Sequence, residues 1–173
     1  METISINGIL YLIFTKDDLL NQFGITIDAE VGLVYVCPES GVFTEEVIEV
    51  PESITEQGQT APVVSFAGGM MVEMTGDIEA AASVSEVILP QSILFLMGGF
   101  LGFTNLQKVT CYAESAPLRS SAIGADAGMD FYATPDTKEL YIPASSDYST
   151  WENDTTWASV NKIYDGFVEI EVF

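Results

Sequence analysis

The stretch EVIEVPESI, residues 46–54, is an apolar strand that stops at a proline and has a serine two positions further on. The same ending returns in VILPQSI at 87–93 and in LYIPASS at 140–146, and VYVCPES at 34–40 is a weaker copy. Proline has no backbone N–H to give to a β-ladder, so it marks the end of each strand. Serine is typical of the turn that follows, because its hydroxyl bonds nearby backbone.

The apolar residues keep one register relative to these prolines. From Pro90 to Tyr112, which takes the place of the proline in LQKVTCYAES, there are 22 positions, and this is the one regular spacing. A unit of that length contributes a strand, a corner and a return path, and buries its apolar side only when stacked on its neighbours. We therefore predict parallel strands with one inward ridge, in which each Pro-x-Ser ending is a corner whose serine bonds its own backbone. The ridge comprises Ile48 and Val50, Val87 and Leu89, Val109 and Cys111, and Leu140 and Ile142.

The segments before and between these strands have weaker patterns. Asn-Gly between the two apolar runs of 3–14 predicts a β-hairpin. Residues 16–24 predict one helical turn that ends at a glycine, 25–37 one or two strands, and 42–50 a further strand. Residues 55–83 fit the repeat poorly, and we expect at most one degenerate repeat there.

The segment VSEVILPQSILFLMGGFLGFTNLQKVTCY, residues 84–112, resembles the repeat of the BspA-like leucine-rich-repeat proteins, which are bacterial cell-surface proteins. Phe103 stands where that family usually has cysteine, and Met97 where it usually has glycine. Residues 109–123 and 137–163 resemble the closing strands and the terminal cap of the same proteins. The residues of 84–112 that match in order are Leu89-Pro90, Ser92-Ile93, Leu96, Gly99-Phe100 and Thr104-Asn105-Leu106.

Together, the repeat pattern and the resemblance predict a mostly β fold of the α/β horseshoe class. We expect one domain over 1–173: a β-rich N-terminal cap at 1–44, degenerate leucine-rich repeats at 45–146, and a small C-terminal cap at 147–173. The resemblance implies a non-enzymatic, secreted or surface-attached protein that mediates adhesion or protein–protein interaction. Its partner would be a protein of a host or of a neighbouring cell. Oligomeric state stays open.

The charge of the chain excludes several classes of partner. With 26 acidic and 5 basic residues, the formal net charge is −21, which repels the phosphate backbones of nucleic acids and anionic lipid surfaces. The longest apolar stretch, 93–103, falls short of the ~20 residues that a membrane-spanning helix needs, so we expect no membrane insertion. The N-terminus does not read as a signal peptide. The chain is therefore either intracellular or a mature form without its leader, and the resemblance favours the cell exterior.

Residues that could carry catalysis are scarce. The chain has no histidine, which removes the commonest general base and zinc ligand. Cys37 and Cys111 lie in apolar runs without metal-ligand spacing, which favours two buried thiols over a disulfide. The glycines of 66–71 and 97–102 do not form nucleotide-binding loops. We expect no enzyme, no metal and no cofactor, although paired carboxylates leave glycoside hydrolysis or a surface Ca²⁺ site as alternatives.

Two groups of residues are candidates for binding. Trp151, Trp157, Val160 and Ile163 have the spacing of a cap packed over the last repeat, and a platform for sugar rings is the alternative. The second group is the four glutamates that flank the first corner. They could bind a basic protein surface, or they could serve only to keep the protein soluble. The rival function is therefore a carbohydrate-binding or Ca²⁺-dependent surface module. The candidate interaction edge consists of Glu45, Glu46, Glu49 and Glu52.

Overall fold

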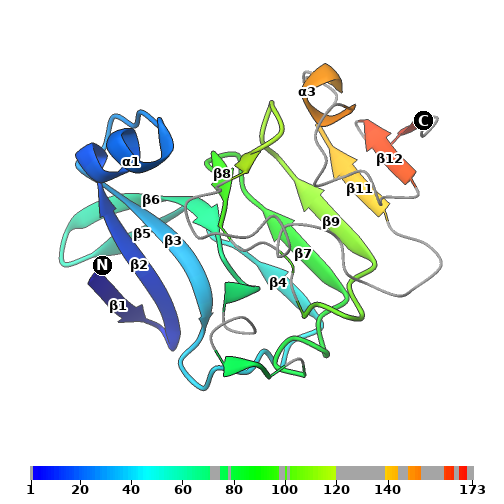
Figure 1. Cartoon of the computed structure of the whole chain (residues 1–173), viewed down its shortest axis with the longest axis horizontal. Coiled ribbons are helices and arrows are strands. Elements are labelled where there is room, and N and C mark those ends of the chain that lie inside the picture. Colours follow the sequence, from blue (N-terminus) through cyan, green and yellow to red (C-terminus); the bar gives the residue numbers. More distant parts are fainter. Residues whose placement is uncertain are drawn as a thin grey trace.

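A computed structural model describes residues 2–70, 75–77, 79–97, 100, 102–119, 139–143, 148–152, 162–165 and 168–170 (Figure 1). The described chain is mostly β-strand, with two short helices. In chain order the elements are β1 (Glu2–Ile6), β2 (Ile9–Thr15), α1 (Lys16–Phe23), β3 (Val31–Pro38), β4 (Val47–Glu49), β5 (Ser53–Glu56), β6 (Gln59–Phe66), β7 (Glu86–Leu89), β8 (Phe95–Leu96), β9 (Lys108–Cys111), β10 (Leu118–Arg119), β11 (Glu139–Ile142), α3 (Tyr148–Glu152), β12 (Lys162–Asp165) and β13 (Val168–Ile170).

The strands form two sheets. The first has the order β1-β2-β3-β6-β8-β10, with β5 paired to β6, and the second has the order β13-β12-β11-β9-β7-β4. From β4 to β12 the second sheet is parallel throughout, and its strands lie side by side in Figure 1. After β4, β7 and β9 the chain turns and supplies β6, β8 and β10 to the first sheet, so each coil crosses both sheets. This is the short leucine-rich-repeat solenoid that the sequence predicts.

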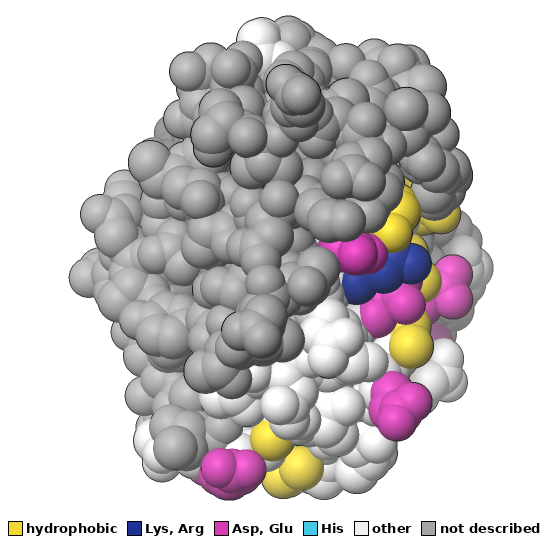
Figure 2. Space-filling model, turned by 90° about the vertical axis from the view of Figure 1, so that its right-hand side faces the viewer, with side chains coloured by type: hydrophobic (Ala, Val, Ile, Leu, Met, Phe, Trp, Pro, Cys, Tyr) yellow, Lys and Arg dark blue, Asp and Glu magenta, His cyan; other side chains and the backbone are white. Residues whose placement is uncertain are grey.

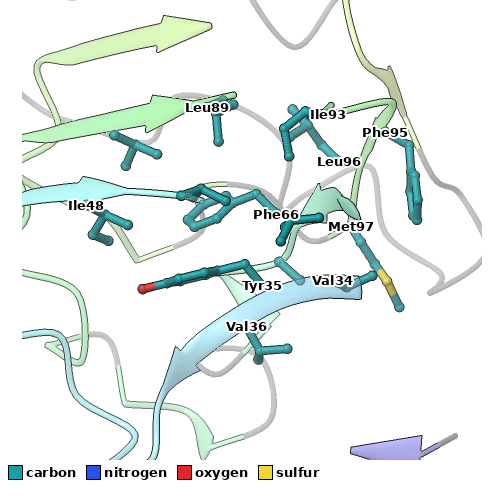
Figure 3. Packing of buried hydrophobic residues seen from close by; sticks show 14 of the residues in the cluster. Val34, Tyr35, Val36, Ile48, Phe66, Leu89, Ile93, Phe95, Leu96 and Met97 are labelled. Carbon is teal, nitrogen blue, oxygen red and sulfur yellow. The ribbon is translucent and has the colours of Figure 1, made fainter. Parts of the chain in front are cut away.

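The inward ridge is the core of the second sheet. Val87 pairs with Val109, Leu89 with Cys111, and Val109 with Leu140, all in parallel register. Every residue of the predicted ridge is at most 4% exposed, so this prediction is confirmed. The same buried cluster includes Phe66 from β6 and the fully buried Phe100, Phe103 and Leu106 of the return path. Figure 3 shows Phe66 stacked with Tyr35 among these side chains.

The prediction that each corner serine bonds its own turn is confirmed for Ser40 and wrong for Ser92. The Ser40 hydroxyl donates to the Val42 carbonyl at 3.1 Å and accepts from the Val42 N–H at 3.3 Å. The Ser92 hydroxyl lies 3.0 Å from the Glu52 carbonyl oxygen and 2.7 Å from that of Val63, both in the preceding coil. Proline brings the serine to the corner, and stacking places the carbonyls of the earlier coil within its reach. Ser53 is instead an exposed residue of β5, and Ser145 lies outside the described residues. The serine at 92 therefore joins one coil to the next.

Ser92→Ala should lower the free energy of unfolding by about 1–3 kcal/mol, because it leaves partly buried carbonyls without their donor. Urea denaturation measures the loss. Ser53→Ala is the matched control, because it removes the equivalent hydroxyl at an exposed position and should change stability by less than about 0.5 kcal/mol. Equal effects of the two substitutions would contradict the role given to Ser92.

The N-terminal strands form as the sequence predicts, with differences in length. Asn7 and Gly8 both adopt positive φ, 52° and 78°, as a two-residue hairpin turn requires, and the predicted hairpin is confirmed. The helix α1 is eight residues long rather than one turn, because a capping box between Thr15 and Asp18 starts it. Gly24 ends it in a left-handed conformation. Residues 25–37 supply the single strand β3, and β4 covers only three residues of 42–50.

The segment that fits the repeat poorly begins with a β-hairpin. β5 and β6 pair in antiparallel register around Gln57 and Gly58, which have φ values of 52° and 80°. The hydroxyls of Thr55 and Thr60 lie 2.7 Å apart across this hairpin. The second half of β6 then runs parallel to β3, with Leu33 opposite Val63. The sheet of the N-terminal strands therefore continues into the coils.

Candidate functional site

The candidate interaction edge lies at one end of the parallel sheet. β4 is the outermost strand there and pairs with β7. Glu45 and Glu46 precede β4, Glu49 lies within it and Glu52 follows the proline corner, and all four residues are exposed. Ile48 points the other way and is 4% exposed. The structure thus places the four exposed glutamates in and around one short strand.

Among the described residues, neither ion pair involves this edge. Lys16 pairs with Glu30 at 2.7 Å between Nζ and Oε1, and Lys108 pairs with Glu86 at 3.0 Å. The whole chain has only five lysines and arginines. In the described part of the molecule, no cation is therefore paired with any of the four edge carboxylates.

An apolar hollow of about 370 Å³ opens beside β4. Its far wall comes from the N-terminal strands, with Ile6, Ile9 and Tyr11. Glu45 and Glu49 lie on the side of β4. Hydrophobic surface next to an uncompensated acidic strand is an arrangement that suits a ligand with both apolar and basic groups.

A larger hollow of about 690 Å³ adjoins the first, and the two share Ile6 and Ile54. Apolar side chains of β1, β2 and β3 line it, among them Ile4, Ile13 and Leu33. Glu30 and Glu56 also line it. Both hollows are therefore lined by apolar side chains together with glutamates, of which Glu30 is paired with Lys16.

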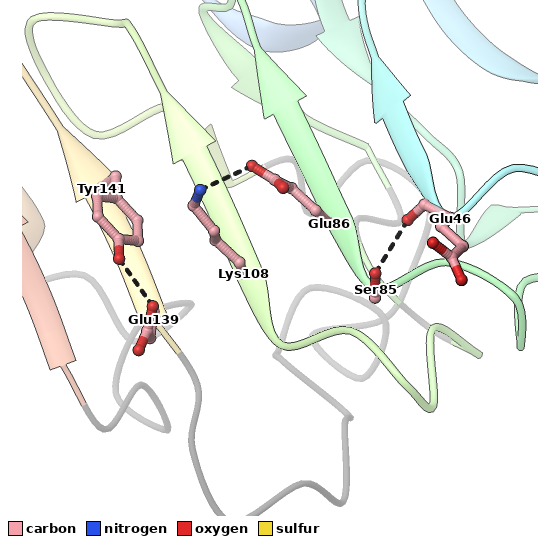
Figure 4. Close-up of polar contacts among 6 residues, drawn as sticks. All are labelled: Glu46, Ser85, Glu86, Lys108, Glu139 and Tyr141. Carbon is pink, nitrogen blue, oxygen red and sulfur yellow. Dashed lines mark hydrogen bonds and ion pairs between the residues drawn. The ribbon is translucent and has the colours of Figure 1, made fainter.

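The outer face of the parallel sheet has a different electrostatic character. Lys108 stands in register between Glu86 and Glu139, and its Nζ lies 4.6 Å from the centre of the Tyr141 ring. The Tyr141 hydroxyl donates to Glu139 at 2.8 Å (Figure 4). On the side of the molecule shown in Figure 2, one dark blue basic group lies between carboxylates. This face therefore has one described cation, paired with Glu86, whereas no described cation is paired with the carboxylates of the edge.

Sequence reasoning missed this row of charges, although a signal was present. Glu86, Lys108 and Glu139 each stand four positions before Pro90, Tyr112 or Pro143, and so occupy one position of the repeat. In stacked parallel strands, residues at the same repeat position become neighbours. Reading charge, and not only hydrophobicity, by repeat position would have found the row.

The two cysteines are packed core residues. Both are free and fully buried, which confirms the prediction of two buried thiols. Burial raises the pKa of Cys37 to about 11 and that of Cys111 to about 12. Both groups are therefore protonated at neutral pH, and a thiol in that state is a poor nucleophile and metal ligand. Within the residues that the structure describes, no group of three Cys, Asp or Glu side chains is placed to hold a metal ion.

Trp151 belongs to the core rather than to a sugar platform. It lies in α3 and is fully buried, as the cap interpretation predicts for this residue. The backbone N–H of Ala116 donates to Thr150 Oγ1 at 2.8 Å and so joins α3 to the segment after β9. Trp157 and Val160 lie outside the described residues, and of Ile163 only the backbone is described.

Comparison with known proteins gives distant structural likenesses. No protein-family model matches the chain, and no curated protein matches its sequence. Similar solved structures include a leucine-rich repeat protein from Bacteroides capillosus, with 15% identity, a TM-score of 0.48, and 94% of this chain and 97% of that one covered. A leucine rich cell surface protein from Faecalibacterium prausnitzii has 11% identity and a TM-score of 0.45, covering 84% of this chain and 38% of that one. The pneumococcal vaccine antigen PcpA has 14% identity and a TM-score of 0.43, covering 98% and 40%.

These likenesses are too distant to establish a family, and the solenoid is recognised from the chain's own parallel strand pairing. The chain spans less than half the length of the second and third of these proteins. No helix among the described residues has the length and hydrophobicity needed to cross a membrane.

Proposed function

We propose that this protein is a non-enzymatic binding module of the BspA-like leucine-rich-repeat type, which acts outside the bacterial cell or at its surface. Its partner is a protein with a basic patch, and it binds at the acidic edge of Glu45, Glu46, Glu49 and Glu52. One observation carries the proposal: four exposed carboxylates, with no described cation paired to them, surround a strand that borders an apolar hollow. The family type and the location rest on the sequence resemblance.

The physical basis is attraction at two ranges. A formal net charge of −21 attracts basic proteins over a Debye length of ~8 Å at physiological ionic strength, and so speeds encounter. At short range, uncompensated carboxylates form ion pairs with the partner without first breaking pairs of their own. In the row of Glu86, Lys108 and Glu139 this advantage is smaller, because Glu86 already pairs with Lys108 and Glu139 accepts from the Tyr141 hydroxyl.

The test compares two variants that each lose four negative charges. The edge variant replaces Glu45, Glu46, Glu49 and Glu52 by Gln, and the control replaces Glu2, Asp28, Glu79 and Glu114, all exposed residues elsewhere, by Gln or Asn. Both are applied with the unmodified protein to an array of purified extracellular matrix and cell-surface proteins. We expect the edge variant to associate with its basic partner about tenfold more slowly at low salt, and the control to stay close to the unmodified protein.

Equal on-rates and equal salt dependence in the edge and control variants would leave the edge with a role in solubility alone. A glycan array with and without Ca²⁺ addresses the rival function. Glycan binding that needs Ca²⁺ and survives in the edge variant would support a carbohydrate-binding module instead.

A further inference from the structure

One side of β4 has no strand beside it, and its backbone pattern shows which groups are free there. The Glu46 carbonyl accepts from the N–H groups of Ser85 at 2.8 Å and Glu86 at 3.1 Å, and the Val50 N–H donates to the Ile88 carbonyl at 2.9 Å. Even-numbered residues therefore direct their backbone groups toward β7. Because these directions alternate along a strand, Val47 and Glu49 direct their N–H and C=O groups to the opposite side. No described residue forms a backbone hydrogen bond with them there.

The apolar hollow lies on this unpaired side. Val47 and Glu49 line it together with Ile6, Ile9 and Tyr11 of the N-terminal strands. At about 370 Å³ it is within the size range of ~300–1,000 Å³ that ligand sites in proteins have. The free backbone groups thus border a space in which another segment fits.

We propose that the free edge of β4 accepts an extended segment of the partner protein as an additional strand of the parallel sheet. This inference rests on the proposed function and specifies its mode of binding. Strand addition gives the partner backbone hydrogen bonds to Val47 and Glu49, while pockets beside the edge select its side chains.

The pleat of the sheet determines the sequence pattern of that segment. Residues of the added strand next to Val47 and Glu49 point outward with them, toward the carboxylates of the edge, and so carry lysine or arginine. Alternate residues point inward with Ile48, toward Ile54 and Tyr35, and so are apolar. The occupant is therefore a basic strand in which charged and apolar residues alternate.

Edge strands usually carry charges that prevent pairing with other strands, and β4 is short and acidic in the same way. Charges of one sign do not exclude every strand, however. Glutamates at this edge repel acidic segments, including those of a second copy at a net charge of −21, and attract basic ones. The same glutamates that protect the edge from self-association thus select the proposed partner.

The test uses the acetylated and amidated peptide Lys-Val-Lys-Ile-Lys-Val-Lys as the probe. Two controls have the same charge: an isomer with its four lysines contiguous, and the probe with alternate backbone nitrogens methylated. Binding is followed by amide hydrogen exchange and by NMR chemical shifts. We expect the probe to slow exchange at Val47 and Glu49 by tenfold or more, and both controls to bind at least about fivefold more weakly.

Two substitutions examine the backbone directly. Val47→Pro removes an N–H that points away from β7, a position where edge strands tolerate proline, and should weaken binding of the probe about fivefold. Val47→Thr keeps that N–H and should bind as the unmodified protein does. Thermal melting of both variants verifies that the fold survives. If Val47→Pro fails to fold, the methylated peptide still decides the matter on the unmodified protein.

The outcomes separate this inference from the proposed function. If all three peptides bind equally, lose affinity in the edge variant and leave Val47 and Glu49 unprotected, strand addition is overturned while electrostatic docking at the edge stands. If no peptide binds but a basic protein on the array does, and through the edge glutamates, strand addition is likewise overturned. If neither the binding of the peptides nor the binding of a basic protein depends on the edge glutamates, both proposals fail.

Discussion

Replacing Phe66 by alanine is expected to lower the free energy of unfolding by about 3–5 kcal/mol. Phe66 is fully buried at the end of β6, and its ring centre lies 5.8 Å from that of Tyr35, 5.7 Å from Phe100 and 5.9 Å from Phe103. These rings come from the N-terminal strands and from the return path between β8 and β9. Loss of the Phe66 ring therefore opens a cavity where both parts of the chain meet. Chemical denaturation with urea measures the change.

Two further variants show that the loss comes from packing. Phe66→Leu retains most of the apolar volume and should lose clearly less stability than the alanine variant. Gln59→Ala, at an exposed position of the same strand, should change it by less than about 0.5 kcal/mol. Gly68 shows how closely this site is packed, since a Cβ there would lie 2.4 Å from Phe66 Cζ and 2.7 Å from Phe103 Cζ. A loss below about 1 kcal/mol for Phe66→Ala would mean that the ring is not central to the core.

The core of the parallel sheet could be predicted because it depends on local pattern. Alternate residues of a strand point to one face, and the proline gives each strand a fixed reference position. Val87, Leu89, Val109 and Cys111 follow from counting back from the corner, and each is fully buried. Once the units are known to be alike, stacking them in register predicts which residues of neighbouring strands pair.

The first sheet could not be predicted in the same way. β8 and β10 are two residues long, too short for any hydrophobic period to appear. β6 pairs with β3 across a long stretch of sequence, and its own hairpin turns at Gln57, a residue type that adopts positive φ less readily than Asn or Gly. Such pairings are decided by tertiary packing and leave little trace in a local pattern.

The candidate site, like the fold, could be predicted from the sequence only in part. Four glutamates near a corner are visible in the sequence, and alternation with the buried Ile48 and Val50 places Glu45 and Glu49 outside the core. The unpaired side of β4 is not visible, because β7, its partner, begins 39 residues after it. The hollow is not visible either, since it forms only where the N-terminal hairpin lies against the first coil.

Trp151→Ala is expected to lower the free energy of unfolding by about 3–5 kcal/mol. The strands nearest to α3 should lose the most protection. Trp151 is the largest fully buried side chain among the described residues, and it lies in α3, which follows β11. In Figure 1, α3 and β11 lie at the opposite end of the molecule from the N-terminal strands. Because each unit of a solenoid contacts mainly its neighbours, loss of a terminal cap exposes the last coil first. Urea denaturation measures the total loss, and amide hydrogen exchange measures its distribution.

A cap and an ordinary core residue differ in that distribution. If Trp151 caps the solenoid, exchange in the alanine variant rises most in β11, less in β9 and β7, and least in β2 and β3. Trp151→Phe, which keeps an apolar ring, should preserve most of the protection. A uniform rise in all strands would mean that the domain opens as one cooperative unit, in which Trp151 contributes volume but does not protect an end. An unchanged stability of Trp151→Ala would contradict both roles, because a fully buried indole cannot be removed from a packed core without cost.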